Sequence, residues 1–240
     1  MVLLLKHPER NIMREKLYLL VVVTLILPLS NTIFAQEETD EPMTFFVTSE
    51  THSGNLGGLE GADAICQRLA STAGAGEYTW AAYLSTHGST SEPAVNARDR
   101  IGNGPWRNAK GVLIANSLAD LHGDIQRDSN LIYAATALTE KGETIPGRHR
   151  PEGTRNEHDI LTGSDSHGRA FSSGASRNTN LTCDNWTSDS PDGSAMVGHH
   201  DRLSGFNTSW NGSHATNGCS IEALAETGGA GRFYCFATDQ

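Results

Sequence analysis

The sequence predicts one α+β domain that follows an export signal. Three features indicate this fold class: a single strongly amphipathic helical segment, strand-like segments near both ends of the domain, and a second half made mainly of Gly, Ser, Thr, Asn and Asp. That second half, residues 159–218, is expected to be a long loop region. It contains two tryptophans and Cys183, and Cys219 directly follows it; these residues favour an ordered loop over disorder.

The first 35 residues have the pattern of a secretory signal peptide. Basic residues precede an apolar run, Leu17–Leu29, and small residues follow it up to Ala35. The run is shorter than the ~20 residues of a membrane-spanning helix, so we expect cleavage after Ala35 and no stable membrane span. Residues 36–43 then form a flexible leader and residues 44–240 form the domain. The mature chain is therefore expected to be secreted, periplasmic or at the cell surface.

A helix is predicted near the start of the domain, within residues 54–74. Its apolar side chains recur at helical spacing and share one face: Leu59, Ala62, Ile65, Cys66 and Leu69. Gly74 suits the left-handed backbone with which many helices end. Cys66 is therefore expected to face the core.

Strands are predicted at both ends of the domain. Residues 43–50 and 78–85 are rich in aromatic and β-branched side chains, and the last strand is "GRFYCFAT", residues 231–238. Side chains of the last strand alternate between two faces. One face carries Phe233, Cys235 and Ala237, and the other carries Tyr234 and Phe236. The first and last strands are expected to pair.

The middle of the chain has weaker signals. "GVLIA", residues 111–115, predicts a short strand, and "NSLADL", residues 116–121, predicts a short helix with Asn116 as its N-cap. Residues 130–140 fit either a strand or a helix. Residues 141–159 fit a loop because Gly, Pro and charged residues dominate them.

The charge of the mature chain argues against polyanionic partners. Four of the 18 Lys/Arg and two of the 28 Asp/Glu lie in the signal peptide, so residues 36–240 carry 14 basic and 26 acidic side chains and a net charge of −12. A surface with this excess of negative charge repels the phosphates of nucleic acids. Nucleic acid is therefore not an expected partner.

The domain contains all four cysteines of the chain: Cys66, Cys183, Cys219 and Cys235. An even number in an exported protein indicates two disulfides. No Cys-x-x-Cys pair is present, which argues against a zinc ribbon or a thioredoxin-type redox centre. Four cysteines can pair in three ways, and their spacing does not select one.

Several segments, taken together, resemble a known fold. They are, in order, "LGGLEGADAICQRLASTAGAGEYTWAAYLS", "ARDRI", "SLADLH", "LTGSDSHGR", "CDNWTS" and "RFYCFAT". The series resembles the C-type-lectin-like fold in its endostatin-related branch, and within it a family of secreted bacterial lectin-like proteins. The resemblance extends from Phe45 to Thr238.

The resemblance implies two helices, short and mostly antiparallel strands, and two nested disulfides, Cys66–Cys235 and Cys183–Cys219. The residues are compatible with this pairing, because an inward-facing helix cysteine can reach the inner face of the last strand. Closing the longer loop is worth ~4 to 5 kcal/mol in the chain-entropy model. The second bridge would fasten the long loop region.

The metal sites of related families are not expected in this chain. C-type lectins use Glu-Pro-Asn or Gln-Pro-Asp and Trp-Asn-Asp triplets around calcium, and this chain has none of them; its "CDNW" resembles an endostatin packing motif. Where endostatins bind zinc, this chain has "TFFV" and "AKGV". We therefore expect no cofactor. The alternative is a calcium site formed by loop carboxylates, with the candidates Asp184, Asp189, Asp192 and Asp201.

A dense polar group, "GHHDR", stands at residues 198–202. Donor atoms for a metal ion are offered there and nearby by His199, His200, Asp201 and His214. Adjacent residues of an extended segment face opposite ways, so His199 and His200 are not expected to bind one ion, and no metal site is predicted. Asp201 is expected to hold the loop in shape by accepting hydrogen bonds from Arg202, a histidine or loop N–H groups.

Ligand contact is the alternative role for this segment. An aromatic face flanked by hydrogen-bonding groups suits a sugar ring, and Trp210 is the contact that we expect to be exposed in this way. The alternative is that Trp186 and Trp210 belong to the core. The candidate ligand-binding residues are Trp210, Asn211, His200, Asp201 and Arg202.

No catalytic motif is apparent. The chain has neither Gly-x-Ser-x-Gly nor His-Glu-x-x-His, and the residues of "SDSHGR" (164–169) are too close in sequence to form a triad. We expect a non-enzymatic, exported binding module that recognises a carbohydrate or a surface protein through its loops. The alternatives are a structural or adhesion protein with a protein partner, and a metal-dependent hydrolase.

Overall fold

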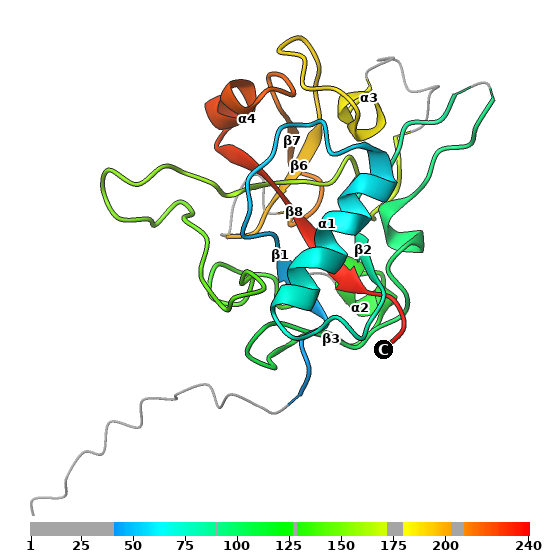
Figure 1. The fold of residues 1–240 in the computed structure, drawn as a ribbon, viewed down its shortest axis with the longest axis vertical. Helices are drawn as coiled ribbons and strands as arrows, with labels where there is room; N and C mark the ends of the chain where they lie inside the picture. The colour runs from blue at the N-terminus through cyan, green and yellow to red at the C-terminus, as the bar shows by residue number, and fades with distance from the viewer. Residues whose placement is uncertain (1–40, 90, 127–128, 172–179, 203–208) are drawn as a thin grey trace, which may run out of the picture. The chain divides into compact units, whose positions relative to one another are not determined.

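The structure is a computed structural model that describes residues 41–240 apart from residues 90, 127–128, 172–179 and 203–208 (Figure 1). The chain divides into two units, Met1–Gln36 and Glu37–Gln240. The predicted signal peptide and most of the predicted leader lie outside the described residues. The described part of the second unit is a mixed α+β fold with four α-helices and two small sheets. In this part of the chain no helix is both long and apolar enough to cross a membrane.

The last strand lies at the centre of the larger sheet. β8 (Gly229–Ala237) pairs antiparallel with β1 (Phe45–Val47) and with β2 (Trp80–Ala82). The predicted pairing of the first and last strands is therefore confirmed. The first two strands are shorter than the segments predicted for them, whereas the last strand begins two residues earlier than predicted.

The remaining strands of this sheet come from the segment predicted to be loop. β5 (Asp159–Leu161) lies parallel to β8, and β6 (Met196–His199) and β7 (His214–Ala215) follow with antiparallel pairing. The prediction of loop throughout residues 159–218 is therefore wrong in part. These strands are short and their flanks are rich in Gly and Ser, so pairing with their neighbours in the sheet, rather than local propensity, makes them strands.

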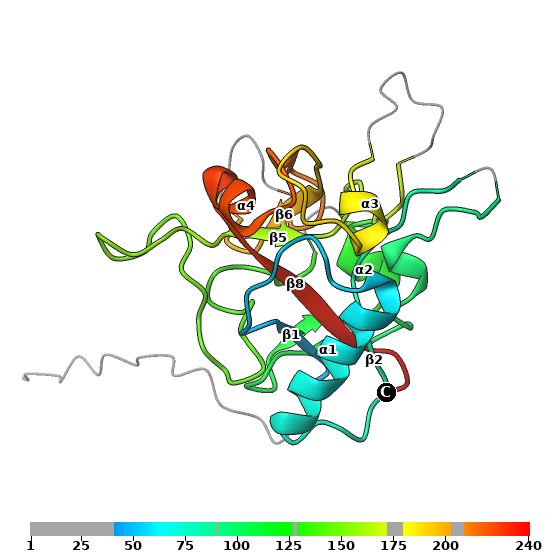
Figure 2. The ribbon, with the colours of Figure 1, turned by 45° about the horizontal axis from the view of Figure 1, so that its top comes forward.

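The longest helix confirms its prediction. α1 (Gly58–Thr72) packs against β2 and β8, and Cys66 is fully buried on its inner face. Gly74 adopts a left-handed backbone just beyond the helix, as expected. Figures 1 and 2 show α1 alongside the C-terminal part of β8, with α4 (Ile221–Thr227) at the other end of that strand.

Both disulfides of the resemblance are present, Cys66–Cys235 and Cys183–Cys219. The first joins α1 to β8, and the second fastens α3 (Cys183–Trp186), a single turn with left-handed backbone. The sequence predicts two helices, and the structure adds the short helices α3 and α4. These helices are only four and seven residues long, too short for a helical period to be visible in the sequence.

The N-cap of α2 (Leu118–His122) differs from the prediction. The cap is Ser117, whose hydroxyl accepts a hydrogen bond from the Asp120 N–H at 3.2 Å. The predicted cap, Asn116, instead donates its backbone N–H to the Asp120 carboxylate at 2.8 Å. Both residues therefore form hydrogen bonds at the start of the helix, but Ser117 rather than Asn116 is its N-cap.

Residues 130–140 form neither the strand nor the helix that fits their sequence. Thr136 Oγ1 accepts a hydrogen bond from the Tyr133 N–H and donates to the Tyr133 carbonyl, so local side-chain bonds hold a turn. β4 (Leu113–Ala115) confirms the predicted short strand. It pairs with β3 (Trp106–Arg107), a strand that the sequence does not predict.

Both faces of β8 are buried, and the predicted alternation along it is confirmed. One core cluster, with α1, contains Phe233, Cys235 and Ala237. The other contains Tyr234 and Phe236 together with Trp106 and Trp210.

Candidate functional site

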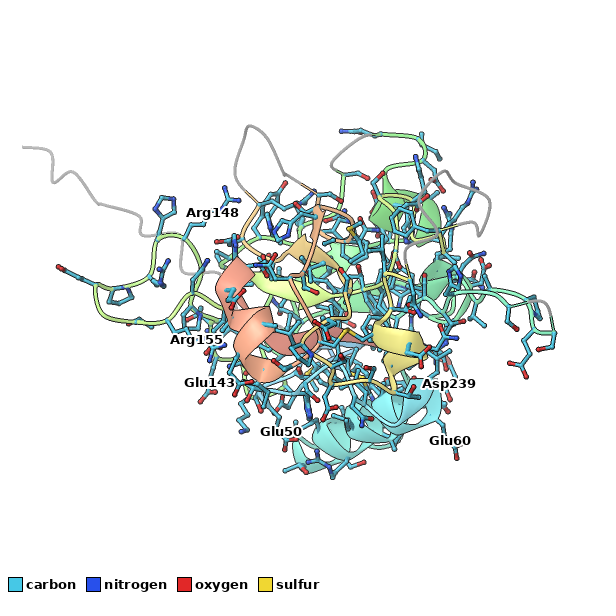
Figure 3. All side chains as sticks on the ribbon, turned by 90° about the horizontal axis from the view of Figure 1, so that it is seen from above. Glu50, Glu60, Glu143, Arg148, Arg155 and Asp239 are labelled. Carbon is cyan, nitrogen blue, oxygen red and sulfur yellow. A yellow bond between two sulfur atoms is a disulfide. The ribbon has the colours of Figure 1, made fainter. Side chains whose placement is uncertain are left out.

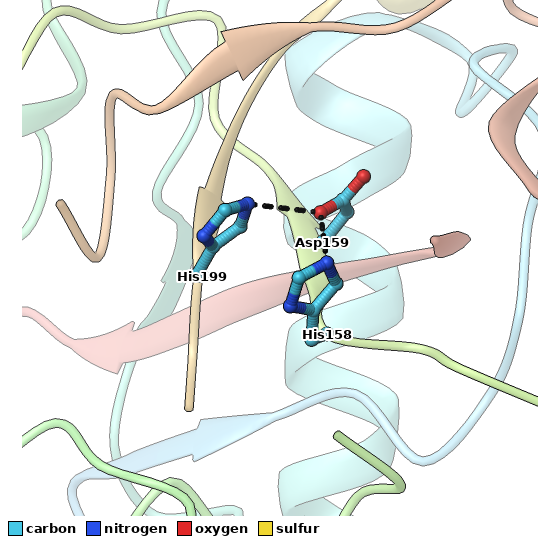
Figure 4. A group of neighbouring side chains, drawn as sticks. All are labelled: His158, Asp159 and His199. Atoms are coloured by element: carbon cyan, nitrogen blue, oxygen red, sulfur yellow. Dashed lines mark ion pairs between the residues drawn. The ribbon is translucent and has the colours of Figure 1, made fainter. Parts of the chain in front are cut away.

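Three histidines surround one buried carboxylate, in a group called here the Asp159 cluster: His158, Asp159, His199 and His214. Oδ1 of Asp159 is 3.1 Å from Nε2 of His158, 3.2 Å from Nε2 of His199 and 3.4 Å from Nε2 of His214. Nε2 of His199 and Nε2 of His214 are 3.0 Å apart. Figure 4 shows one ring nitrogen of His158 and one of His199 directed at the same oxygen of the Asp159 carboxylate.

Strand pairing assembles the cluster. Asp159 on β5 and His199 on β6 lie opposite each other, and His214 on β7 lies opposite Val197, one strand period from His199. His158 precedes β5, whose register with β8 shifts directly after Asp159. Such an irregularity re-aims side chains, and here two adjacent residues point at one place.

The cluster has a buried side and an accessible side. The side chains of Asp159 and His199 are 0% and 1% exposed, and that of His158 is 8% exposed. The His214 side chain is 29% exposed. Solvent therefore reaches the cluster past His214.

The outer ring nitrogens also have partners. Nδ1 of His158 is 3.2 Å from Oδ1 of Asp201, and Nδ1 of His214 is 3.2 Å from the carbonyl oxygen of Ala215. Carboxylate and carbonyl oxygens accept hydrogen bonds, so these contacts favour a proton on Nδ1 of His214 and, where Asp201 rather than the donor Arg148 is the partner, on Nδ1 of His158.

Nδ1 of His199 lies between two groups. Ser213 Oγ is 3.4 Å away and Nη2 of Arg148 is 3.3 Å away. Nε of Arg148 also lies 3.3 Å from Nδ1 of His158. Arg148 belongs to the exposed segment before β5, and Figure 3 shows it on the other side of the domain from Glu60 of α1.

Charge is concentrated at the Asp159 cluster. Burial opposes ionisation of Asp159, but its contacts with the three histidines outweigh burial and hold the pKa of its carboxyl well below the usual range. Burial also opposes protonation of His158, yet Asp159 and Asp201 outweigh it and raise the pKa of His158 to about 9. The contact with Asp159 likewise raises the pKa of His214. The carboxylate is therefore ionised at neutral pH.

The structure brings together only some of the metal-ligand candidates that the sequence suggested. His199 and His214 belong to the cluster, whereas Asp201 lies outside it, behind His158. His200 is fully buried, its ring nitrogens have no hydrogen-bond partner among the described residues, and burial lowers its pKa to about 4. The prediction that His199 and His200 do not face the same ion agrees with this arrangement.

Two members of the cluster, His158 and Asp159, are missed by the sequence. They are adjacent residues in a segment predicted to be loop, and the rule that neighbours face opposite ways argues against using both. The available signal was the "HD" pair directly before the apolar "IL" of residues 160–161, at the start of a short buried strand.

The expected exposure of Trp210 is wrong. Trp210 is 3% exposed, because its ring packs among Tyr83, His122 and Tyr234. Asn211 is fully buried and donates a hydrogen bond from Nδ2 to Tyr83 Oη at 2.9 Å. Neither side chain is available as a surface contact for a ligand.

Asp201 and Arg202 hold loops together. Asp201 Oδ2 accepts a hydrogen bond from the Arg148 N–H at 2.6 Å, and its Oδ1 faces His158, so the expected loop N–H and histidine partners are observed. Arg202 donates to the carbonyl oxygens of Ile132 and Asn130 at 2.9 and 3.0 Å. Both residues therefore connect residues 201–202 to distant loops.

The calcium candidates are separated. Asp184, Asp189 and Asp192 are exposed, whereas Asp201 is buried behind His158. Among the residues that the structure describes, the group whose ligand atoms lie within 4.8 Å of one another is His158, Asp159 and His199. Histidine nitrogen with one carboxylate oxygen is a ligand set typical of zinc rather than calcium.

A cavity of about 660 Å³ adjoins the cluster on the side of Asp201. Its wall includes Tyr133, residues 144–151, Asp201 and Arg202. The guanidinium of Arg202 lies 4.6 Å from the centre of the Tyr133 ring, and Tyr133 is 37% exposed.

Comparison of the sequence with protein-family models and with curated proteins gave no match.

Proposed function

We propose that this chain is an exported, non-enzymatic binding module of the C-type-lectin-like fold. The sequence resemblance supports this fold, and the α+β architecture with two nested disulfides is compatible with it. Disulfides are typical of proteins that mature in oxidising compartments, which supports export. Fold alone does not define a ligand, so the ligand must be inferred from a site.

The ligand that we propose is a carbohydrate bound in the cavity beside Tyr133. The observation that carries this proposal is a partly exposed aromatic ring, fixed from one side by Arg202, in the wall of a cavity of about 660 Å³. That volume lies within the range of small-molecule sites, ~300 to 1,000 Å³. An aromatic ring with polar groups around it suits the apolar face and hydroxyls of a sugar ring.

The charge of the cavity wall favours an acidic sugar. Arg148, His149 and Arg150 line the cavity together with Arg202, against one carboxylate, that of Asp201. Guanidinium groups recognise carboxylates through paired hydrogen bonds. The rest of the mature chain is strongly acidic, so this basic wall is a local exception to the net charge.

Binding to an array of neutral and uronic-acid glycans tests the proposal. We expect binding to the acidic set, weakened at least about tenfold by Tyr133→Ala, since buried tyrosine contacts often carry ~2 kcal/mol or more. Ile125→Ala is the matched control, because Ile125 is an exposed apolar residue outside the cavity wall. Binding that Tyr133→Ala leaves unchanged, or no glycan binding by the folded protein, would contradict the proposal.

Two other functions remain as alternatives. A structural or adhesion role with a surface-protein partner would appear as capture of a protein that glycans do not displace. A metal-dependent hydrolase is favoured by the histidines around Asp159, but it needs a metal coordination position open to water. His214 stands on the accessible side of that cluster, which favours the binding module.

A further inference from the structure

The geometry of the Asp159 cluster suits a cation at its centre. Both oxygens of the Asp159 carboxylate are buried without a hydrogen bond among the described residues, although three imidazole nitrogens lie within 3.4 Å of Oδ1. A buried carboxylate is costly unless it is paired and hydrogen-bonded. The nitrogens are thus close enough to share an ion with the carboxylate but are not arranged to donate hydrogen bonds to it.

The protonation of the rings points to the same conclusion. Metal binding requires the neutral form of each ring. In neutral His214 the Ala215 carbonyl oxygen retains the proton on Nδ1, so that the lone pair of Nε2 faces Oδ1 of Asp159. In neutral His158 the Asp201 carboxylate does the same when Nε of Arg148, 3.3 Å from the same Nδ1, turns away. Lone pairs of nitrogen and oxygen directed at one point repel each other. A divalent cation at that point converts the repulsion into coordination.

The distances fit zinc. Zinc–nitrogen and zinc–oxygen bonds of about 2.0 to 2.1 Å in a tetrahedron place neighbouring ligand atoms roughly 3.3 Å apart. The distances from Oδ1 of Asp159 to the three Nε2 atoms, and that between Nε2 of His199 and Nε2 of His214, are 3.0 to 3.4 Å. Three nitrogens and one carboxylate oxygen form a ligand set of the kind zinc prefers.

We propose that His158, Asp159, His199 and His214 form a zinc-binding centre with one ion per chain. The ligand atoms are the three Nε2 atoms and Oδ1 of Asp159, and His214 closes the site on its accessible side. The centre joins β5, β6 and β7. It therefore stabilises the edge of the sheet formed by strands that carry no disulfide cysteine.

Asp201, Ala215 and Ser213 orient the zinc ligands. Metal-bound histidines usually donate their other ring N–H to a carboxylate, a carbonyl or a hydroxyl, and these three residues supply such an acceptor to His158, His214 and His199. Arg148 competes with Ser213 for His199. Because Arg148 is a long side chain on an exposed segment, it can turn away when zinc fixes the ring.

The test is metal binding by the protein with both disulfides intact, so that no thiol competes for the metal. We expect one zinc per chain by elemental analysis, and visible absorption bands typical of four-coordinate cobalt when Co²⁺ replaces it. His199→Ala and Asp159→Asn each weaken zinc binding at least 100-fold. Asp201→Asn weakens it about 10- to 100-fold, as expected for a residue that positions a ligand.

The control variant is His167→Ala, since the His167 side chain is 61% exposed and lies outside the cluster. It should bind zinc like the parent chain. If the cluster variants fail to fold, the stoichiometry and the cobalt spectrum of the parent chain decide the question alone. A folded parent chain without stoichiometric zinc or cobalt binding overturns the proposal, as does unchanged affinity in a folded His199→Ala variant.

Azide tests the role of His214. A metal with four protein ligands does not bind azide, so the cobalt spectrum of the parent chain should not change when azide is added, whereas that of His214→Ala should change. An azide-sensitive spectrum in the parent chain would contradict ligation by His214 and indicate an open position. Loss of glycan binding in Tyr133→Ala with zinc retained would show that the two sites are separate.

Discussion

Two buried polar groups of this domain contain histidine, and their buried polar atoms are stabilised in different ways. In the Tyr83 network, defined as Tyr83, His122 and Asn211, Tyr83 Oη lies 2.8 Å from Nε2 of His122 and accepts a hydrogen bond from Asn211. Nδ1 of His122 lies 2.9 Å from the Leu118 carbonyl oxygen. Neutral groups thus satisfy one another, and burial lowers the pKa of His122 to about 4.

The Asp159 cluster is the opposite case. It contains an ionised carboxylate whose oxygens have no hydrogen bond among the described residues, surrounded by three ring nitrogens. A satisfied neutral network stabilises the fold by itself. A buried charge is stable only beside an opposite charge, which here comes from bound protons or from a bound ion. The convergence of three ring nitrogens on one carboxylate oxygen is why we assign ligand chemistry to the second group and not to the first.

The largest expected effect is that of Asp159→Asn on stability. Removing the carboxylate leaves three clustered imidazoles without their counter-charge or shared ligand, and breaking a buried ion pair in this way costs ~3 to 5 kcal/mol. Urea unfolding with zinc present measures it. Asp189→Asn, which changes an exposed carboxyl group, should shift the free energy of unfolding by less than ~0.5 kcal/mol. A loss below 1 kcal/mol in Asp159→Asn would remove the contrast between the two groups.

The second effect is that of Gly168→Ala on the Tyr83 network. Gly168 has φ +74°, and a methyl group there would overlap Tyr83 Oη and Nε2 of His122. We expect a loss of ~2 to 4 kcal/mol, from overpacking and from the left-handed backbone. Gly153→Ala is the matched control, since Gly153 has φ +80° and no atom near its added methyl group. Equal losses in the two variants would mean that the network is not the cause.

Tyr83→Phe should have a smaller effect. It removes the hydroxyl that pairs with His122 and Asn211 and leaves two buried groups with fewer partners, at a cost of ~1 to 3 kcal/mol. Thermal or urea unfolding measures the loss, and zinc binding should not change. Tyr133→Phe, at an exposed ring, serves as the control. A variant that loses zinc along with stability would show that the two groups are coupled.

The smallest effect is a pH dependence that arises from His122. In the unfolded chain this ring takes up a proton near pH 6.5, whereas in the folded protein it does so only near pH 4, so the unfolded state binds more protons between these values. The free energy of unfolding should fall as the pH falls from 6.5, by ~1 kcal/mol at pH 5.5. The free energy of unfolding, measured across this pH range, should fall less steeply in His122→Gln than in the parent protein. Parallel curves for the two proteins would contradict the assignment.

The sequence predicts well the elements that depend on local periodicity. α1 follows from the spacing of its apolar residues, and the two faces of β8 follow from simple alternation. Prediction fails for very short strands whose formation depends on partners far apart in the chain. β5 is only three residues long and is a strand because β6 and β8 pair with it.

The residues of the candidate site were likewise only partly predictable from the sequence. His199 and His214 are recognisable as possible ligands because they stand in a dense polar segment. Their partners His158 and Asp159 are some 40 residues earlier in the chain. The register of β5 against β6 brings Asp159 opposite His199, and no local pattern contains that register.

The sequence by itself determined the amphipathic helix, the last strand and the presence of cysteines suited to two bridges, because side-chain period and residue type act locally. Only the tertiary structure decided that Trp210 is in the core, that Tyr133 lines a cavity, and that four side chains from three strands and a preceding loop meet at one point. Burial and convergence depend on packing between segments distant in the chain. Residue types in a sequence show which atoms are available, and the fold determines which of them meet.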